Sequence, residues 1–322
     1  LDKMHISVRR DAFCGKFSVM DVFCQYELPF SAYPPHVSHP ASDTFAQHLE
    51  RFAQVCRVVK GMRRMTVGAI GARTTAFKTV RFDELALQRN GITTETMDLS
   101  QVIARVNAMD ATSDACRAKA KLLKGYTNWD GVPEKAQTNL AKLGVVVDQI
   151  IEEAQLDAVA IRCWLELEEQ LGIAPCVILS ELNNRHIPAA CELDVCNAVA
   201  MRMLMLASQK PAACLDWNNN YGEDEDKCIL FHCGPIAQSL MTGKGQIVDH
   251  PMFAKALGPG HGFGPNQGRI TPSPMTFASS RTHEGALRFY LGEGAFTDDP
   301  IPEEFFGCAG VARIEHLQDV LQ

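Results

Sequence analysis

Short apolar segments alternate with helical patterns through the middle of this 322-residue chain. The segments that we expect to be strands cover residues 156–163, 176–179, 187–191 and 211–215. Between the last two lies the stretch VCNAVAMRMLMLAS, which predicts a buried helix over residues 195–208. Strands that alternate with helices usually pair in the same direction. The pattern therefore predicts an α/β fold with a mainly parallel sheet.

Similar patterns precede this region, and a different texture follows it. Helices are predicted over residues 43–60, 82–89 and 133–155, and a strand begins at Met65. From residue 214 onward, acidic, asparagine-rich and glycine-rich stretches separate short β-like pieces at 229–232 and 270–278. We expect three parts: residues 1–60 as the trailing part of a first α/β domain, 61–213 as a second α/β domain, and 214–322 as a β-rich C-terminal domain.

Composition excludes several classes of function. Hydrophobic residues make up 46% of the chain, which favours a globular protein, and the formal net charge of −7 argues against nucleic acid as a partner. No run of about twenty apolar residues is present, and the amino end is charged. We therefore expect a cytoplasmic protein without a membrane partner.

The 12 cysteines are interpreted as reduced thiols. Several of them fall inside predicted core segments, which fits buried thiols better than a disulfide framework. Cys228 and Cys233 lie close together but lack the spacing and the companion ligands of a zinc site.

Two acidic residues follow consecutive predicted strands. Glu192 lies in the segment ACELD and Asp216 in the segment CLDW, a separation of 216 − 192 = 24 residues, or about one βαβ step. Open α/β sheets place their sites beyond the carboxyl ends of the strands, so both carboxylates are expected to face one cleft. Such a pair suits proton transfer or metal binding. An alternative stays open, in which both are helix N-caps or loop carboxylates that satisfy backbone N–H groups.

Neither glycine-rich segment indicates a nucleotide site. The turn after the strand at Met65 carries Gly68 and Gly71 without the full dinucleotide-binding fingerprint. The segment GPGHGFG at residues 258–264 lacks the Lys-Ser/Thr ending of a phosphate loop, and it is interpreted as a mobile loop.

Several segments together resemble the L-fucose and L-arabinose isomerase family of aldose–ketose isomerases. They are RMTVGAIGARTTAFKTVRFDE, AIRCW, IPAACELD and CLDWNNN followed by LFHCG. The resemblance covers roughly residues 10 to 322 and implies two α/β domains, a β-rich domain, a divalent metal that is usually manganese, and trimers or hexamers with sites between subunits. Because the chain begins with Leu1, we expect it to lack part of the first domain.

The resemblance also implies roles for individual residues. Glu192 and Asp216 match the family's metal ligands and acid/base pair, and His232 resembles a further metal ligand of the arabinose branch. The family's last metal-binding histidine has no matching segment before Gln322. His261 and His283 are the local candidates for it, although loop or surface positions are the simpler interpretation of both.

Moving a sugar carbonyl from C1 to C2 requires removal of a proton from one carbon and return of a proton to its neighbour. Two carboxylates beside the C1–C2 bond can do this through an enediol, and an oxygen-bound divalent ion can polarise the carbonyl. Three alternatives stay open: a non-catalytic sugar-binding or regulatory relative on the same scaffold, a periplasmic-type binding protein, and a lyase or epimerase that uses the same enediolate.

Overall fold

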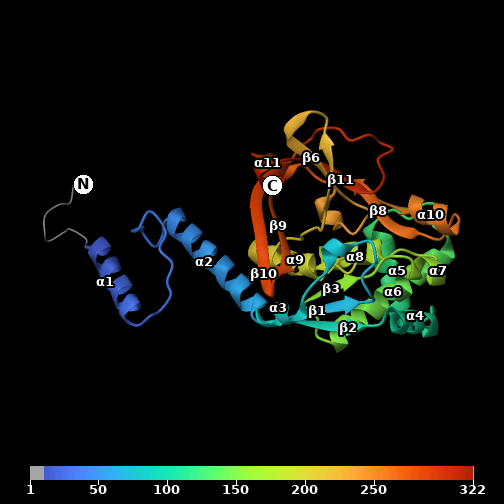
Figure 1. Ribbon diagram of the computed structural model, residues 1–322, viewed down its shortest axis with the longest axis horizontal. Coiled ribbons are helices and arrows are strands. Elements are labelled where there is room, and N and C mark those ends of the chain that lie inside the picture. Colours follow the sequence, from blue (N-terminus) through green and yellow to red (C-terminus); the bar gives the residue numbers. More distant parts are fainter. Residues whose placement is uncertain (1–10, 322) are drawn as a thin grey trace. The chain divides into compact units, whose positions relative to one another are not determined.

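The computed structural model describes residues 11–321 (Figure 1). Its internal contacts divide the chain into two compact units, one up to Val59 and one from Lys60 onward. The first unit contains α1 (Ala12–Gln25) and most of α2 (Asp43–Met62). The amphipathic helix predicted over residues 43–60 is thus confirmed.

A four-stranded parallel sheet forms the centre of the second unit. Its order is β2-β1-β3-β4, built from β1 (Met65–Ile70), β2 (Ile92–Met97), β3 (Ala158–Ile161) and β4 (Ala189–Ala190). Each neighbouring pair in it is parallel. The predicted parallel-sheet α/β fold is therefore confirmed.

Helices cover both faces of this sheet because alternate strand residues enter two separate cores. In β3, Val159 and Ile161 join one core, while Ala158 and Ala160 join the other. The first core is completed by α4 (Leu99–Ala108), α5 (Asp114–Tyr126), α6 (Glu134–Glu153), α7 (Glu166–Leu171) and α8 (Cys176–Asn184). The second is covered by α3 (Glu84–Gln88) and α9 (Val195–Ser208). The helix predicted over residues 195–208 is confirmed at both ends.

Two of the predicted strands are wrong. Residues 176–179 form the first turn of α8, a helix buried on nearly all sides, and its continuous apolar run has no period that separates helix from strand. Residues 211–215 have no strand pairing, and the next strand begins only at Asp216. Its apolar character reflects contacts with neighbouring cores, in which Ala212 and Leu215 take part.

The C-terminal region forms a seven-stranded mixed sheet, as the β-rich prediction requires. Its main path is β5-β6-β11-β10-β9, and β8 pairs with both β11 and β7. The long strands β9 and β10 run side by side in Figure 1. The elements are β5 (Asp216–Tyr221), β6 (Asp224–His232), β7 (Gln246–Asp249), α10 (Pro251–Leu257), β8 (Phe263–Arg269), β9 (Ser273–His283), β10 (Ala286–Phe296), β11 (Cys308–Arg313) and α11 (Leu317–Leu321).

Polar side chains tie the two sheets together within the second unit. The Asn197 side-chain oxygen on α9 accepts hydrogen bonds from the Ser279 hydroxyl at 2.8 Å and from the Ser280 backbone N–H at 3.4 Å. The Asn183 amide on α8 donates to the carbonyls of Ala189 and Pro235 at 3.0 and 2.8 Å. These bonds fix the end of β4 relative to the segment that follows β6.

The longest helices of the described residues are α2 and α6, with 20 residues each. Both are amphipathic and carry charged side chains. Within residues 11–321, no helix combines the length and the apolar character that crossing a lipid bilayer requires.

A buried ion network joins α5, α6 and α8. Lys119 is 7% exposed, and its ammonium lies 2.5 Å from Asp148 and 3.4 Å from Glu181, whose side chain is 3% exposed. Arg185 pairs with both carboxylates as well. A buried charge that loses a partner is destabilising because its desolvation is no longer compensated.

We expect Lys119→Ala to lower the free energy of unfolding by roughly 3 kcal/mol, the lower end of the range for a broken buried pair, since Arg185 still pairs with Glu181. Urea denaturation measures this. The matched control is Lys121→Ala, an exposed position on the same helix, which should change stability by less than about 0.5 kcal/mol. Equal stabilities of the two variants would contradict a stabilising network.

Candidate active site

Glu192 lies in a strained turn immediately after β4. Glu192 and Leu193 both adopt φ +62°, in the left-handed region that non-glycine residues rarely occupy. Two backbone bonds hold the turn: Leu193 donates to the Ile161 carbonyl at 3.3 Å, and Asp194 donates to the Cys191 carbonyl at 3.0 Å. Each such residue costs on the order of 1 kcal/mol, and strain of this kind clusters at functional sites.

Asp194, and not Glu192, caps the following helix. Its carboxylate accepts hydrogen bonds from the Asn197 backbone N–H at 2.9 Å and from the Asn197 side-chain amide at 2.7 Å at the start of α9. The alternative in which Glu192 is a helix N-cap is therefore wrong. The carboxylate of Glu192 is left without a capping role.

Asp216 reaches the same neighbourhood from a different sheet. It is the first residue of β5, where it pairs with Phe231 of the antiparallel strand β6. The expectation that it follows a parallel strand is therefore wrong, whereas Glu192 does follow one. His232 is the last residue of β6, so the pairing of β5 with β6 places it beside the start of β5.

The charges of Glu192, Asp216 and His232 act on one another. Burial raises the pKa of Glu192 to about 7; the His232 charge opposes this rise and the Asp216 charge adds to it. Asp216 is open to solvent, but surrounding protein partly desolvates it and raises its pKa, against the opposing effect of His232. Among residues 11–321, no hydrogen bond or ion pair engages either carboxylate side chain. Both are therefore available to a ligand.

His232 is buried, and its ring has one nitrogen engaged. The Cys233 backbone N–H donates to Nδ1 at 2.8 Å, and the Cys233 sulfur lies 3.2 Å from the same nitrogen. Burial lowers the pKa of His232 and the negative groups of Cys233, Asp216 and Glu192 raise it, while the N–H donated to Nδ1 requires a neutral ring in this conformation. A neutral ring with Nδ1 as acceptor and a protonated ring both carry a proton on Nε2. In this conformation His232 is a hydrogen-bond donor.

The donor set fits a divalent ion only in part. Two carboxylates without other partners are hard oxygen ligands of the kind that manganese or magnesium prefers. His232 fits less well, because Nδ1 is engaged and Nε2 carries a proton. Within residues 11–321, no three His, Cys, Asp or Glu side chains are arranged as a metal site. Metal binding by Glu192, Asp216 and His232 stays a prediction.

The two further histidine candidates lie on the surface. His261 is exposed and its Nδ1 lies 3.1 Å from the Gly258 carbonyl, while His283 ends β9 beside Glu284. Neither is among the charges that shift the pKa of Glu192.

Four cysteines beside Glu192 and His232 were not predicted as a group. Cys163, Cys176, Cys191 and Cys233 follow or begin four different elements, and their thiols are linked by hydrogen bonds. Local sequence carries no signal for this cluster because the spacing is irregular. All 12 cysteines are free, in agreement with the predicted reduced thiols.

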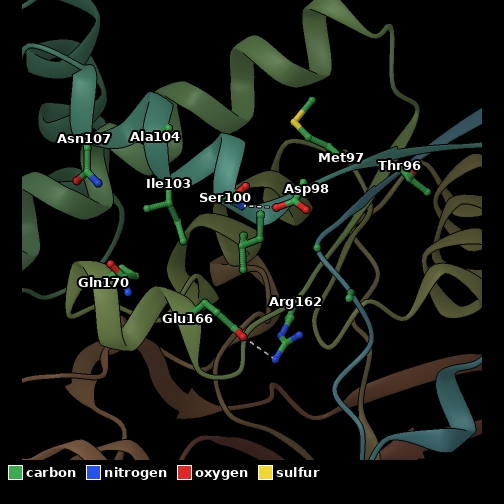
Figure 2. A pocket seen from close by; sticks show the side chains of 13 residues that line it. Thr96, Met97, Asp98, Ser100, Ile103, Ala104, Asn107, Arg162, Glu166 and Gln170 are labelled. Carbon is green, nitrogen blue, oxygen red and sulfur yellow. Dashed lines mark hydrogen bonds and ion pairs between the residues drawn. The ribbon is translucent and has the colours of Figure 1, made fainter.

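A cavity of about 800 Å³ lies at the carboxyl ends of β1, β2 and β3 (Figure 2). Arg162 follows β3 at its edge and pairs with Glu166 at 2.8 Å, while Asp98 accepts from the Ser100 backbone N–H at the start of α4. This is the point where the strand order reverses, the usual ligand position in such sheets. Glu192, Asp216 and His232 are not among its lining residues.

Glu168 on α7 is a buried acid that sequence patterns did not reveal. It is fully buried, and neither carboxylate oxygen has a hydrogen-bond partner among the described residues. Burial raises its pKa to about 9, so that the folded protein carries it protonated at neutral pH. The unfolded chain releases that proton above pH 4.5. Because of Glu168, the free energy of unfolding therefore falls as the pH rises from about 4.5 to 9.

We expect Glu168→Gln to remove this loss, which amounts to on the order of 3 kcal/mol at pH 7. Thermal unfolding at pH 5 and pH 8 measures it: the melting temperature of the variant should fall less between the two pH values than that of the wild type. Glu169→Gln, at the exposed neighbouring position, should behave as the wild type. Parallel pH profiles for wild type and Glu168→Gln would contradict a protonated Glu168.

Comparisons with known proteins bear on both ends of the chain. Residues 1–63 match the model of the fucose/sulfoquinovose isomerase N-terminal domain, and residues 230–322 match the L-fucose isomerase C-terminal domain. The resemblance to the L-fucose isomerase family is confirmed. His232 lies in the second matched region, whereas Glu192 and Asp216 lie between the two.

Curated relatives extend the similarity through the middle of the chain. Proteins named sulfoquinovose isomerase are 25% identical over 285 residues in Priestia aryabhattai, 29% over 282 in Alkalicoccus urumqiensis and 24% over 279 in Clostridium sp. (strain MSTE9). These alignments cover 86%, 84% and 85% of this chain. They cover 60%, 61% and 60% of the relatives, so the chain spans about three fifths of their length.

Proposed function

We propose that this chain carries the acid/base residues of an aldose–ketose isomerase that works through an enediol. The observation that carries the proposal is that the charge of Asp216 raises the pKa of Glu192, although the two carboxylates come from different sheets. No hydrogen bond or ion pair among the described residues engages either carboxylate. The matches to fucose isomerase domains and to sulfoquinovose isomerases support the reaction class.

The two carboxylates have complementary environments. Glu192 is half-buried, and its pKa near 7 suits a group that both takes and returns a proton at neutral pH. Asp216 is more exposed at the start of β5, and burial by the surrounding protein raises its pKa against the opposing effect of His232. In the proposed reaction, Glu192 removes the proton from one sugar carbon and returns it to the neighbouring carbon. Asp216 exchanges the hydroxyl proton on the other side of the C1–C2 bond.

His232 contributes a fixed donor to this site. Its ring is held by the Cys233 backbone N–H at 2.8 Å, which leaves Nε2–H to donate to a sugar oxygen. Gly234 keeps the following chain close to β8, since a side chain there would lie 2.3 Å from the Asn266 backbone nitrogen. The donor is therefore preorganised, which limits the reorganisation needed when negative charge develops on oxygen.

A divalent cation, most simply manganese, is part of the proposal. Glu192 and Asp216 would hold it through one carboxylate oxygen each, with the other oxygens left for substrate. When bound, such an ion polarises the substrate carbonyl as a Lewis acid.

Sulfoquinovose is the first substrate to test, because the curated relatives are named for it. L-fucose is the second, because residues 230–322 match the L-fucose isomerase C-terminal domain. We also propose that the protein assembles as a homotrimer or homohexamer, as the family resemblance implies. Light scattering on the purified protein tests it, and a monomer at all concentrations would contradict it.

We expect Glu192→Gln and Asp216→Asn each to lower kcat at least 100-fold with unchanged circular dichroism, since a carboxamide cannot accept the proton. Reduced turnover is measured by ketose formation from sulfoquinovose and from L-fucose. The matched controls are Glu225→Gln and Asp226→Asn, two exposed positions on β6 with the same chemical changes. Variants at Glu192 or Asp216 with wild-type turnover would refute the assignment.

We expect manganese titrated into the wild-type protein to bind, and Glu192→Gln or Asp216→Asn to weaken that binding at least tenfold, since each removes an oxygen ligand. Isothermal titration calorimetry measures it without any need for activity. His232→Gln distinguishes a ligand from a donor: unchanged manganese affinity indicates the donor role, and a tenfold loss indicates a third ligand. No binding by the wild type would favour a non-catalytic sugar-binding relative.

A further inference from the structure

We propose that Cys176 and Cys233 form a redox-active pair, which peroxide converts reversibly into a disulfide. Their sulfur atoms lie 3.4 Å apart although the residues are separated by 57 positions in sequence. A disulfide bond is about 2.05 Å long, so the sulfurs need to approach by about 1.4 Å. The proposal does not rest on the proposed isomerase activity, and the Cys233 sulfur also lies 3.2 Å from Nδ1 of His232.

The segments that carry the two sulfurs are already fastened to each other. Cys176 begins α8, and two later residues of that helix bind the chain that follows Cys233. The Ser180 hydroxyl donates to the Ile236 carbonyl at 2.5 Å, and the Asn183 amide donates to the Pro235 carbonyl at 2.8 Å. These bonds hold the backbones of the pair in place. Bond formation therefore requires side-chain rotation with little backbone movement.

The two thiols differ in access to an oxidant. Cys233 is the more exposed residue of the two, since it is half-buried while Cys176 is 1% exposed, and we therefore place the first oxidation at Cys233. The Cys233 sulfur attacks one peroxide oxygen and the O–O bond breaks, which gives a sulfenic acid and one water. The Cys176 sulfur then attacks the sulfenic sulfur, the S–S bond forms, and the second water leaves. The two thiols supply two electrons and two protons, which reduce one hydrogen peroxide to two waters.

A third thiol, that of Cys191, competes with Cys176 as the disulfide partner of Cys233. Cys191 is also within hydrogen-bonding reach of both sulfurs. Cys191 lies in the turn after β4, where its carbonyl accepts a hydrogen bond from the Asp194 backbone N–H at 3.0 Å. Cys176 is favoured over it because the Cys176 sulfur lies in direct contact with the Cys233 sulfur. That contact is 3.4 Å long.

Disulfide mapping of the full chain tests the proposal. The protein is treated with one equivalent of hydrogen peroxide, free thiols are blocked with iodoacetamide, and digestion is carried out without reductant. Trypsin leaves Cys163 with Cys176, and Cys228 with Cys233, in the same peptides. Digestion with Glu-C and chymotrypsin is therefore added, since these cut between the members of each pair. We expect a peptide that links Cys176 to Cys233 and that disappears after dithiothreitol.

Two variants sharpen the result. Cys176→Ala should accumulate the Cys233 sulfenic acid, which dimedone traps, and Cys308→Ala, a buried position on β11, should still form the link. A link from Cys233 to Cys191, irreversible oxidation of Cys233 without a link, or no oxidation of Cys233 would each overturn the proposal. The wild-type map decides the question even where a variant does not fold.

Discussion

Burial of the parallel sheet on both faces is the constraint on which the rest of this structure depends. All four residues of β3 are fully buried, and they alternate between a core under α4 to α8 and a core under α9. A sheet covered on both faces exposes only its ends. The loops at the carboxyl ends of the strands are therefore where polar side chains such as Arg162 and Glu192 can lie without entering a core.

The candidate site uses this edge together with a second sheet. Glu192 lies in a turn after β4 that is strained by two residues in the left-handed conformation. The turn is held by the Asp194 cap of α9 and by a hydrogen bond to the Ile161 carbonyl. Asp216 and His232 come from paired antiparallel strands of the C-terminal sheet. The hydrogen bonds of Asn183 and Asn197 between the sheets thus set the geometry of the site as much as the acidic residues do.

The environment of the site is richer in sulfur and buried acid than the isomerase chemistry requires. Cys176 and Cys233 are brought together by the same α8 contacts that support the end of β6. Glu168 is buried without a hydrogen-bond partner in the described part of the chain. The buried acid lowers the stability of the fold and the thiol pair is chemically reactive. Such groups cluster mainly near functional sites.

The sequence by itself determined the elements whose signals are local. Apolar periodicity and capping residues were sufficient for the parallel fold, for α9 from Val195 to Ser208 and for the position of Glu192 after a strand. Tertiary structure decided what depends on distant partners: residues 176–179 became helical, Asp216 came to lie on an antiparallel strand, and four separate cysteines formed one cluster. The physical reason is that periodicity reports which side of a segment is buried. It does not report which distant segment buries it.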